Sequence, residues 1–174
     1  FTVRALRGGG AVYLGRAAGR SWEHGRYGGP YQRDLLMEMG AMVETLETSH
    51  TWTRLGELHR AVAAAIREAL DGQGTPGLVF CHLSHAYPDG ASLYFTFISR
   101  ARRGAEVEQW AAVKKAASEA IVANGATITH HHAVGRDHVP YMEAEVGETG
   151  LEVLRAVKER LDPTGIMNPG KLLP

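Results

Sequence analysis

The spacing of apolar residues changes several times along this chain of 174 residues, and the order of those changes limits the folds it can adopt. Residues 51–71 and 106–123 repeat apolar side chains at helical spacing. Shorter segments rich in β-branched and aromatic residues are predicted to be strands: 41–48, 77–85, 91–99 and 126–130. The chain therefore alternates between strands and helices.

The predicted order is strand, helix, two strands, helix, strand, which is the split β-α-β arrangement of ferredoxin-like folds. The turn at 87–90 is short, so its two flanking strands should form an antiparallel hairpin. We therefore predict an α+β fold, with a ferredoxin-like antiparallel sheet and helices on one face. A helix at 147–161 and an irregular tail rich in Pro and Gly, 162–174, form a C-terminal helical segment.

The composition also predicts how the chain is divided. Residues 1–40 read as a lead-in of loops and helices, and Phe1 in place of an initiator Met suggests the truncation of a larger chain. Residues 41–135 form the ferredoxin-like domain. Residues 136–174 form the C-terminal segment.

The net charge and the cysteine content exclude several classes of function. The sequence has 19 basic and 19 acidic residues, so no long-range field favours nucleic acid or an anionic membrane. Cys81 is the single cysteine, which rules out an internal disulfide and a cysteine-based zinc site. We also find no apolar run long enough to span a bilayer, and we expect a cytoplasmic protein.

Three adjacent histidines, His130, His131 and His132, are the strongest functional signal. The alternative is that these histidines lie in a solvent-exposed loop and have no functional role. If the backbone is extended, His130 and His132 project to one side and His131 points away, and no carboxylate lies close in sequence. Asp137 and His138 follow at short range and keep a metal site open. A site for one metal ion usually needs three protein ligands, and only two with suitable geometry can be named, so a metal site is not the preferred prediction. We instead expect these side chains to hydrogen-bond to a phosphate or carboxylate of a substrate.

Alternation along the strands places the other polar side chains. Tyr94 falls on the polar face of its strand, either as part of a pocket or as a half-buried aromatic residue whose hydroxyl meets water. His82 and His85 are predicted to lie on opposite faces of their strand, and so are Glu44 and Glu47, which therefore do not form an acid pair.

Several segments resemble one enzyme family. These are the stretch HHHAVG at 130–135, SLYFTF at 92–97 and YQRDL at 31–35. In order and spacing they resemble the alkyldihydroxyacetonephosphate synthases, which belong to the FAD-linked enzymes of the vanillyl-alcohol-oxidase type. The tail at 162–172, DPTGIMNPGKL, is similar to the ending of FAD-linked oxidases and dehydrogenases, including those that act on D-lactate and glycolate.

The resemblance implies that this chain is the C-terminal cap portion of such an enzyme. In the family, an upstream half binds FAD and the following half, with its ferredoxin-like sheet, covers the flavin and forms the substrate pocket. The glycines at 8–10 lack the strand-loop-helix context of a phosphate-binding loop. We therefore expect the upstream FAD-binding domain of the same polypeptide to be the main partner, and this chain alone to be inactive.

The resemblance also implies roles for individual residues. Tyr94 matches the tyrosine that exchanges a proton with the substrate carbon next to the carbonyl, which requires neighbours that stabilise its phenolate. Arg33 matches the arginine that grips the substrate phosphate, to which its planar guanidinium is suited. The histidines at 130–132 match a loop that lines the site, and Asn168 and Lys171 are assigned to cofactor binding.

Three functions stay open at this point. The first is a synthase, in which a flavin-dependent exchange replaces an acyl group by an alkyl group in ether-lipid synthesis. The second is an FAD-linked oxidase or dehydrogenase of a hydroxy acid, and the third is a non-catalytic ferredoxin-like binding module. The expected ligand is a phosphorylated or carboxylated small molecule or lipid. Peripheral membrane association and a homodimer also stay open for the full enzyme.

Overall fold

The computed structural model describes residues 2–173 and divides into two compact units, one ending at Met39 and the other beginning at Gly40. The first unit contains α1 (Thr2–Gly8), α2 (Ala17–Gly25) and α3 (Gly29–Glu38). Pro30 lies in the first turn of α3, where its missing N–H is not needed, as the sequence predicts.

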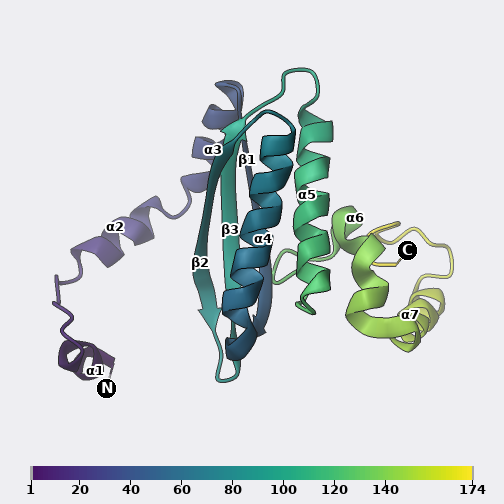
Figure 1. The fold of residues 1–174 in the computed structure, drawn as a ribbon. Helices are drawn as coiled ribbons and strands as arrows, with labels where there is room; N and C mark the ends of the chain where they lie inside the picture. The colour runs from purple at the N-terminus through teal and green to yellow at the C-terminus, as the bar shows by residue number, and fades with distance from the viewer. Residues whose placement is uncertain (1, 174) are drawn as a thin grey trace. The chain divides into compact units, whose positions relative to one another are not determined.

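The second unit is built on an antiparallel sheet with the strand order β1-β3-β2. Its strands are β1 (Ala41–Thr51), β2 (Gly77–Ala86) and β3 (Gly90–Arg100). The long helices α4 (Trp52–Gly72) and α5 (Glu106–Ala123) lie side by side and cover one face of this sheet (Figure 1). The predicted α+β class, with helices on one face of an antiparallel sheet, is confirmed.

The hydrophobic core lies between the sheet and these two helices. Phe95 and Phe97 of β3 are fully buried there, and Ile66 of α4 and Val113 of α5 pack against the same core. Each such side chain contributes about 2 kcal/mol by its removal from water. The apolar side chains of the strands therefore determine which face of the sheet the two helices cover.

The predicted strand at 126–130 is wrong, although this segment lies beside β1. The N–H groups of Thr127 and His130 donate to carbonyls of β1 at 3.3 and 3.1 Å. The intervening N–H of Ile128 instead donates to the carboxylate of Glu145 at 2.8 Å. In a regular ladder the N–H groups of every second residue point to the same neighbouring strand, but those of Thr127 and His130 are three residues apart. No continuous ladder therefore forms, and the sheet has three strands in the described residues.

The start of α4 also differs from the prediction that Thr51 or Thr53 caps it. Thr51 occupies the N-cap position but makes no capping hydrogen bond, and its hydroxyl lies 3.4 Å from Nδ1 of His50. The N–H of Trp52 donates instead to the carbonyl of Asp89, at 3.1 Å. A tertiary contact with the β2–β3 turn thus replaces the local cap.

The C-terminal region follows as α6 (Gly135–His138), a short 3-10 helix (Val139–Tyr141) and α7 (Met142–Leu161). Gly147 has φ 70° and kinks α7, so the helix predicted from 147 onward is its second part. In the tail, the carboxylate of Asp162 accepts hydrogen bonds from the N–H groups of Ile166 and Met167 at 3.1 and 2.9 Å. This carboxylate organises a segment that forms no helix or strand.

Among the helices of the described residues, none combines the length and the apolar character that crossing a membrane requires.

Gln109 connects α5 to the loops at the end of the sheet. Its buried amide donates to the hydroxyl of Thr75 and the carbonyl of Arg100, both at 2.9 Å, and accepts from the N–H of Arg102 at 2.8 Å. One side chain therefore satisfies three polar groups, two of them on the backbone.

We expect Gln109→Leu to lower the free energy of unfolding by about 3 kcal/mol, because it removes three hydrogen bonds made by a fully buried side chain. Urea unfolding of this chain measures the change. The neighbouring exposed residue provides the control, since Glu108→Gln should change stability by less than about 0.5 kcal/mol. Equal stability of both variants would contradict this role of Gln109.

Candidate active site

Polar residues gather on the face of the sheet opposite α4 and α5, which we call the site face. The strand register pairs Tyr94 of β3 with Glu47 of β1 on one side and with His82 of β2 on the other. Directly paired residues in a sheet project to the same face. Because Phe95 points into the core under the helices, its neighbour Tyr94 and both of these partners lie on the site face.

A β-bulge brings a further histidine to this face. The register between β2 and β3 shifts between Leu83 and Ala86, so that Ser84 and His85 together oppose Ser92. The N–H of His85 donates to the hydroxyl of Ser92, at 2.9 Å. The prediction that His82 and His85 lie on opposite faces is therefore wrong, because the extra residue in the bulge cancels the alternation.

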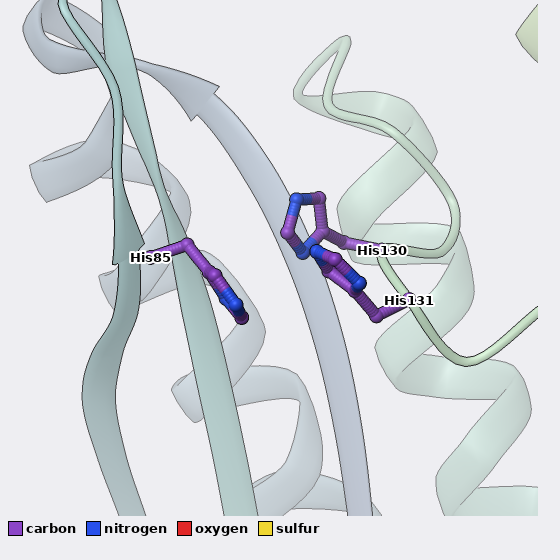
Figure 2. A group of neighbouring side chains, drawn as sticks. All are labelled: His85, His130 and His131. Atoms are coloured by element: carbon purple, nitrogen blue, oxygen red, sulfur yellow. The ribbon is translucent and has the colours of Figure 1, made fainter.

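The histidine run is not extended, which corrects the geometry assumed from sequence. His131 and Ala133 both have φ 61°, in the left-handed region. This conformation turns His131 toward β2, where its ring stacks on that of His85 with centroids 4.5 Å apart and an interplanar angle of 16°. Figure 2 shows His85 on its strand pointing toward His130 and His131 on their loop.

The carboxylate of Glu47 is the centre of this group. Its Oε1 lies 3.2 Å from Nδ1 of His130 and 3.4 Å from Nδ1 of His85, and its Oε2 lies 3.8 Å from Nε2 of His132. Glu47 is 3% exposed, so its charge is held away from water. The contact with His130 is close but not aligned as a hydrogen bond, so the negative charge of Glu47 acts on this ring through space. A carboxylate is thus present, although none is close in sequence.

The surroundings shift the pKa values of two of these groups. Burial acts to raise the pKa of Glu47, but polar contacts with Ser92, Ser84 and His130, together with the charge of His130, outweigh it and lower the pKa below its ordinary value. Burial lowers the pKa of His132, although the charge of Glu47 opposes that shift. The structure therefore favours an ionised Glu47 and a neutral His132.

Histidines of this group contact Tyr87 and Tyr94. Nε2 of His130 lies 3.1 Å from the hydroxyl of Tyr87. The ring of Tyr94 meets His132 edge-on with centroids 5.4 Å apart, and it stacks on His82 at 5.2 Å. Because phenols, imidazoles and a carboxylate are in contact, the arrangement is suited to proton transfer.

His85, His130 and His131 also form a group that could hold a metal, with ligand atoms all within 4.8 Å of one another (Figure 2). A nitrogen ligand binds a metal through a lone pair in the plane of its ring. The lone pairs of stacked rings such as His85 and His131 run side by side and do not converge. An ion could be held here only after this stack opens.

The remaining predicted site residues lie elsewhere in the chain. Arg33 is on α3, in the unit that ends at Met39. Asn168 and Lys171 line a small pocket beside Lys158, at the end of α7, and none of the histidines lines that pocket. The fold thus brings Tyr94 together with the histidine run but gives Asn168 and Lys171 other surroundings.

The sequence did not predict that Glu47, His85 and Tyr87 lie beside the histidine run. The available signal was a charged residue, Glu47, in the middle of a strand between Leu46 and Thr48. The strand register, which places Glu47 opposite Tyr94, was also needed to connect it with the histidines.

Comparison with known proteins identifies relatives along almost the whole chain. Residues 7–172 match the family model of FAD linked oxidases, C-terminal domain. The chain is 37% identical over 165 residues to an alkyldihydroxyacetonephosphate synthase of Trypanosoma brucei brucei, covering 95% of this chain. It is 35% identical to that of Dictyostelium discoideum, covering 94% of this chain. In both cases it spans 27% of the relative's length.

A solved structure gives the same result at the level of the fold. The chain matches a structure of alkyldihydroxyacetonephosphate synthase with a TM-score of 0.61 and 27% sequence identity. The match covers 86% of this chain and 24% of the solved one.

The lowered pKa of His132 predicts a pH dependence of stability. Because the unfolded chain binds a proton more readily at this histidine, the free energy of unfolding should fall as the pH drops below the ordinary value of 6.5. Glu47 should add a further loss below its ordinary value of 4.5, because its pKa is also lowered.

We therefore expect His132→Gln to reduce the loss of unfolding free energy between pH 7.5 and pH 5.5. Urea unfolding at both pH values measures it. His24→Gln, in α2, serves as the control and should leave the difference unchanged. If the unfolding free energy of His132→Gln fell between the two pH values as much as that of the unsubstituted chain, this explanation of the pH dependence would be wrong.

Proposed function

Because the chain belongs to the family of FAD-linked oxidases, as their C-terminal domain, we propose that it forms the substrate-binding part of an enzyme with alkyldihydroxyacetonephosphate synthase activity. The observation that carries this proposal is the gathering of Tyr94 and the histidine run around Glu47, in a chain similar to such synthases over 95% of its length. The proposed reaction replaces an acyl group by an alkyl group without net oxidation.

The site face has the chemistry that a flavin ring requires beside it. Leu78 and Phe80 of β2 alternate with core-facing residues and are 62% and 53% exposed, which offers apolar surface for the faces of a planar ring. Tyr94 and the histidines offer polar groups near it on the same face. The flavin, when bound with the FAD-binding domain, supplies the redox-active ring on which the exchange takes place.

We assign the chain's own residues different tasks in this reaction. Tyr94 exchanges a proton with the substrate carbon next to the carbonyl, and His132 packs against the Tyr94 ring in an edge-on contact that helps to position it. His131 is exposed, and its ring nitrogens make no hydrogen bond with another described residue, so it is available to a substrate oxygen. His130 lies between Glu47 and Tyr87: its Nδ1 contacts the carboxylate and its Nε2 contacts the phenol hydroxyl.

Electrostatics favours Arg33 over the histidines as the group that holds the substrate phosphate. The ionised carboxylate of Glu47 repels an anion, and a neutral histidine beside it offers little compensation. A guanidinium is always charged and binds phosphate oxygens through two N–H groups at once. The substrate class that we propose is therefore a phosphorylated lipid precursor, with its phosphate at Arg33.

An FAD-linked oxidase or dehydrogenase of a hydroxy acid is the second candidate, favoured by the tail at 162–172. One experiment separates the two. The full-length flavoprotein is supplied with acyl-dihydroxyacetone phosphate and a long-chain alcohol, and the product is identified by mass spectrometry. Formation of the alkyl product supports the synthase. Reduction of an electron acceptor with D-lactate or glycolate, without alkyl product, supports the oxidase.

We expect Tyr94→Phe in the full-length enzyme to lower turnover by about 100-fold or more while leaving the flavin bound, because general acid-base catalysis contributes at least that much. Turnover is measured as the rate of alkyl product formation, and bound flavin by its visible absorbance. Tyr141→Phe, at the short helix before α7, is the matched control. Full activity of Tyr94→Phe would remove this tyrosine from the mechanism.

We expect Arg33→Lys to raise the KM for the phosphorylated substrate by about tenfold, since a lysine cannot reproduce the two parallel hydrogen bonds of a guanidinium. Steady-state kinetics measures KM and kcat separately. Arg20→Lys, in α2, is the control of the same chemistry. An unchanged KM in Arg33→Lys would show that another cation holds the phosphate.

A further inference from the structure

Three side chains on the site face form a continuous chain from a buried carboxylate to an exposed phenol. Oε1 of Glu47 lies 3.2 Å from Nδ1 of His130, and Nε2 of the same ring lies 3.1 Å from the hydroxyl of Tyr87. Glu47 is 3% exposed and Tyr87 is 42% exposed. The order is therefore carboxylate, imidazole, phenol, solvent.

The backbone of Tyr87 is held from two sides, so this geometry does not depend on the tyrosine ring alone. Its N–H donates to the carbonyl of Gly90 at 2.8 Å, and its carbonyl accepts from the indole of Trp52 at 3.1 Å. A Cβ on Gly90 would come within 2.3 Å of the carbonyl oxygen of His50, so this turn requires glycine. The turn therefore presents the phenol to His130.

The ionised carboxylate decides which ring nitrogen of His130 carries the proton. A negative oxygen 3.2 Å from Nδ1 stabilises a proton on that nitrogen. Nε2 of the neutral ring is then an acceptor and receives a hydrogen bond from the hydroxyl of Tyr87. If the phenol gives up its proton, the resulting imidazolium is stabilised by Glu47, as in a carboxylate-histidine pair that supports a nucleophile.

We propose that Glu47, His130 and Tyr87 form a proton relay in which Tyr87 accepts the proton of an alcohol substrate. This inference rests on the proposed synthase function and deepens it. The exchange of acyl for alkyl involves two different protons, one on the substrate carbon and one on the alcohol oxygen. The site offers two phenols, Tyr94 beside His132 and Tyr87 beside His130, and each of these histidines contacts a different oxygen of Glu47.

The proton balance of this step closes. As the alcohol oxygen bonds to the substrate carbon, its O–H bond breaks and the proton passes to Oη of Tyr87. The proton of Tyr87 passes to Nε2 of His130, and the imidazolium later returns it to solvent. The acyl group leaves as a carboxylate, so the proton released by the alcohol is the single proton produced, and nothing is oxidised or reduced overall.

Two readouts on the full-length flavoprotein test the relay. Deuterium uptake from heavy water at the substrate carbon reports the task of Tyr94, and incorporation of a long-chain alcohol reports the task of Tyr87. We expect Tyr87→Phe to lower alcohol incorporation by about 100-fold while changing deuterium uptake less than twofold. Tyr141→Phe is the matched control and should change neither rate, and the flavin absorbance confirms that each variant is folded.

The outcomes separate the two levels of the proposal. If the unsubstituted enzyme does not incorporate an alcohol, the synthase function itself fails. If it does, but Tyr87→Phe incorporates alcohol at an unchanged rate, or loses both reactions equally with its flavin bound, the relay is overturned.

Glu47 provides a second test if Tyr87→Phe does not retain its flavin. Glu47→Asp keeps the charge, and Glu47→Gln keeps the length of the side chain without the charge. A relay that depends on the carboxylate charge predicts that Glu47→Asp incorporates alcohol at least about tenfold faster than Glu47→Gln. Equal rates in these two variants, with flavin bound, would overturn the role of Glu47 as the positioning residue of His130.

Discussion

The buried carboxylate of Glu47 organises the site face more than any other group in it. A charge removed from water is costly unless polar partners surround it, and here the histidines and serines of three different chain segments do so. β1 supplies the carboxylate, the β2 bulge supplies His85, and the loop after α5 supplies His130 and His132. One charge thus connects segments that are far apart in sequence.

Two departures from regular backbone geometry make this arrangement possible. The bulge in β2 turns His85 to the same face as His82, and the left-handed conformation of His131 folds the histidine run back over the sheet. A regular strand and an extended loop would each have sent one of these side chains away. The bulge and the left-handed residue therefore bring several imidazoles together on one face. The regular core on the other face holds the sheet in place.

The same contacts that stabilise the site also give its histidines different chemistry. His130 is engaged at both ring nitrogens, His132 is biased toward the neutral form by burial, and His131 is exposed to solvent. In the mechanism that we propose, three consecutive histidines therefore have different tasks. His130 is part of the relay, His132 lies beside Tyr94, and His131 is open to the substrate. Their environments differ because His130 and His132 lie near different oxygens of the Glu47 carboxylate, whereas His131 stacks on His85.

The sequence by itself determined the long helices α4 and α5, the three strands and the core under them, because periodicity and composition act locally. Tertiary structure decided that 126–130 does not join the sheet, because the N–H groups that reach β1, those of Thr127 and His130, do not follow the two-residue repeat of a ladder. It also decided that Glu47 and Tyr87 lie beside the histidine run. Those contacts depend on strand register and on a bulge, which long-range pairing sets and no local pattern encodes.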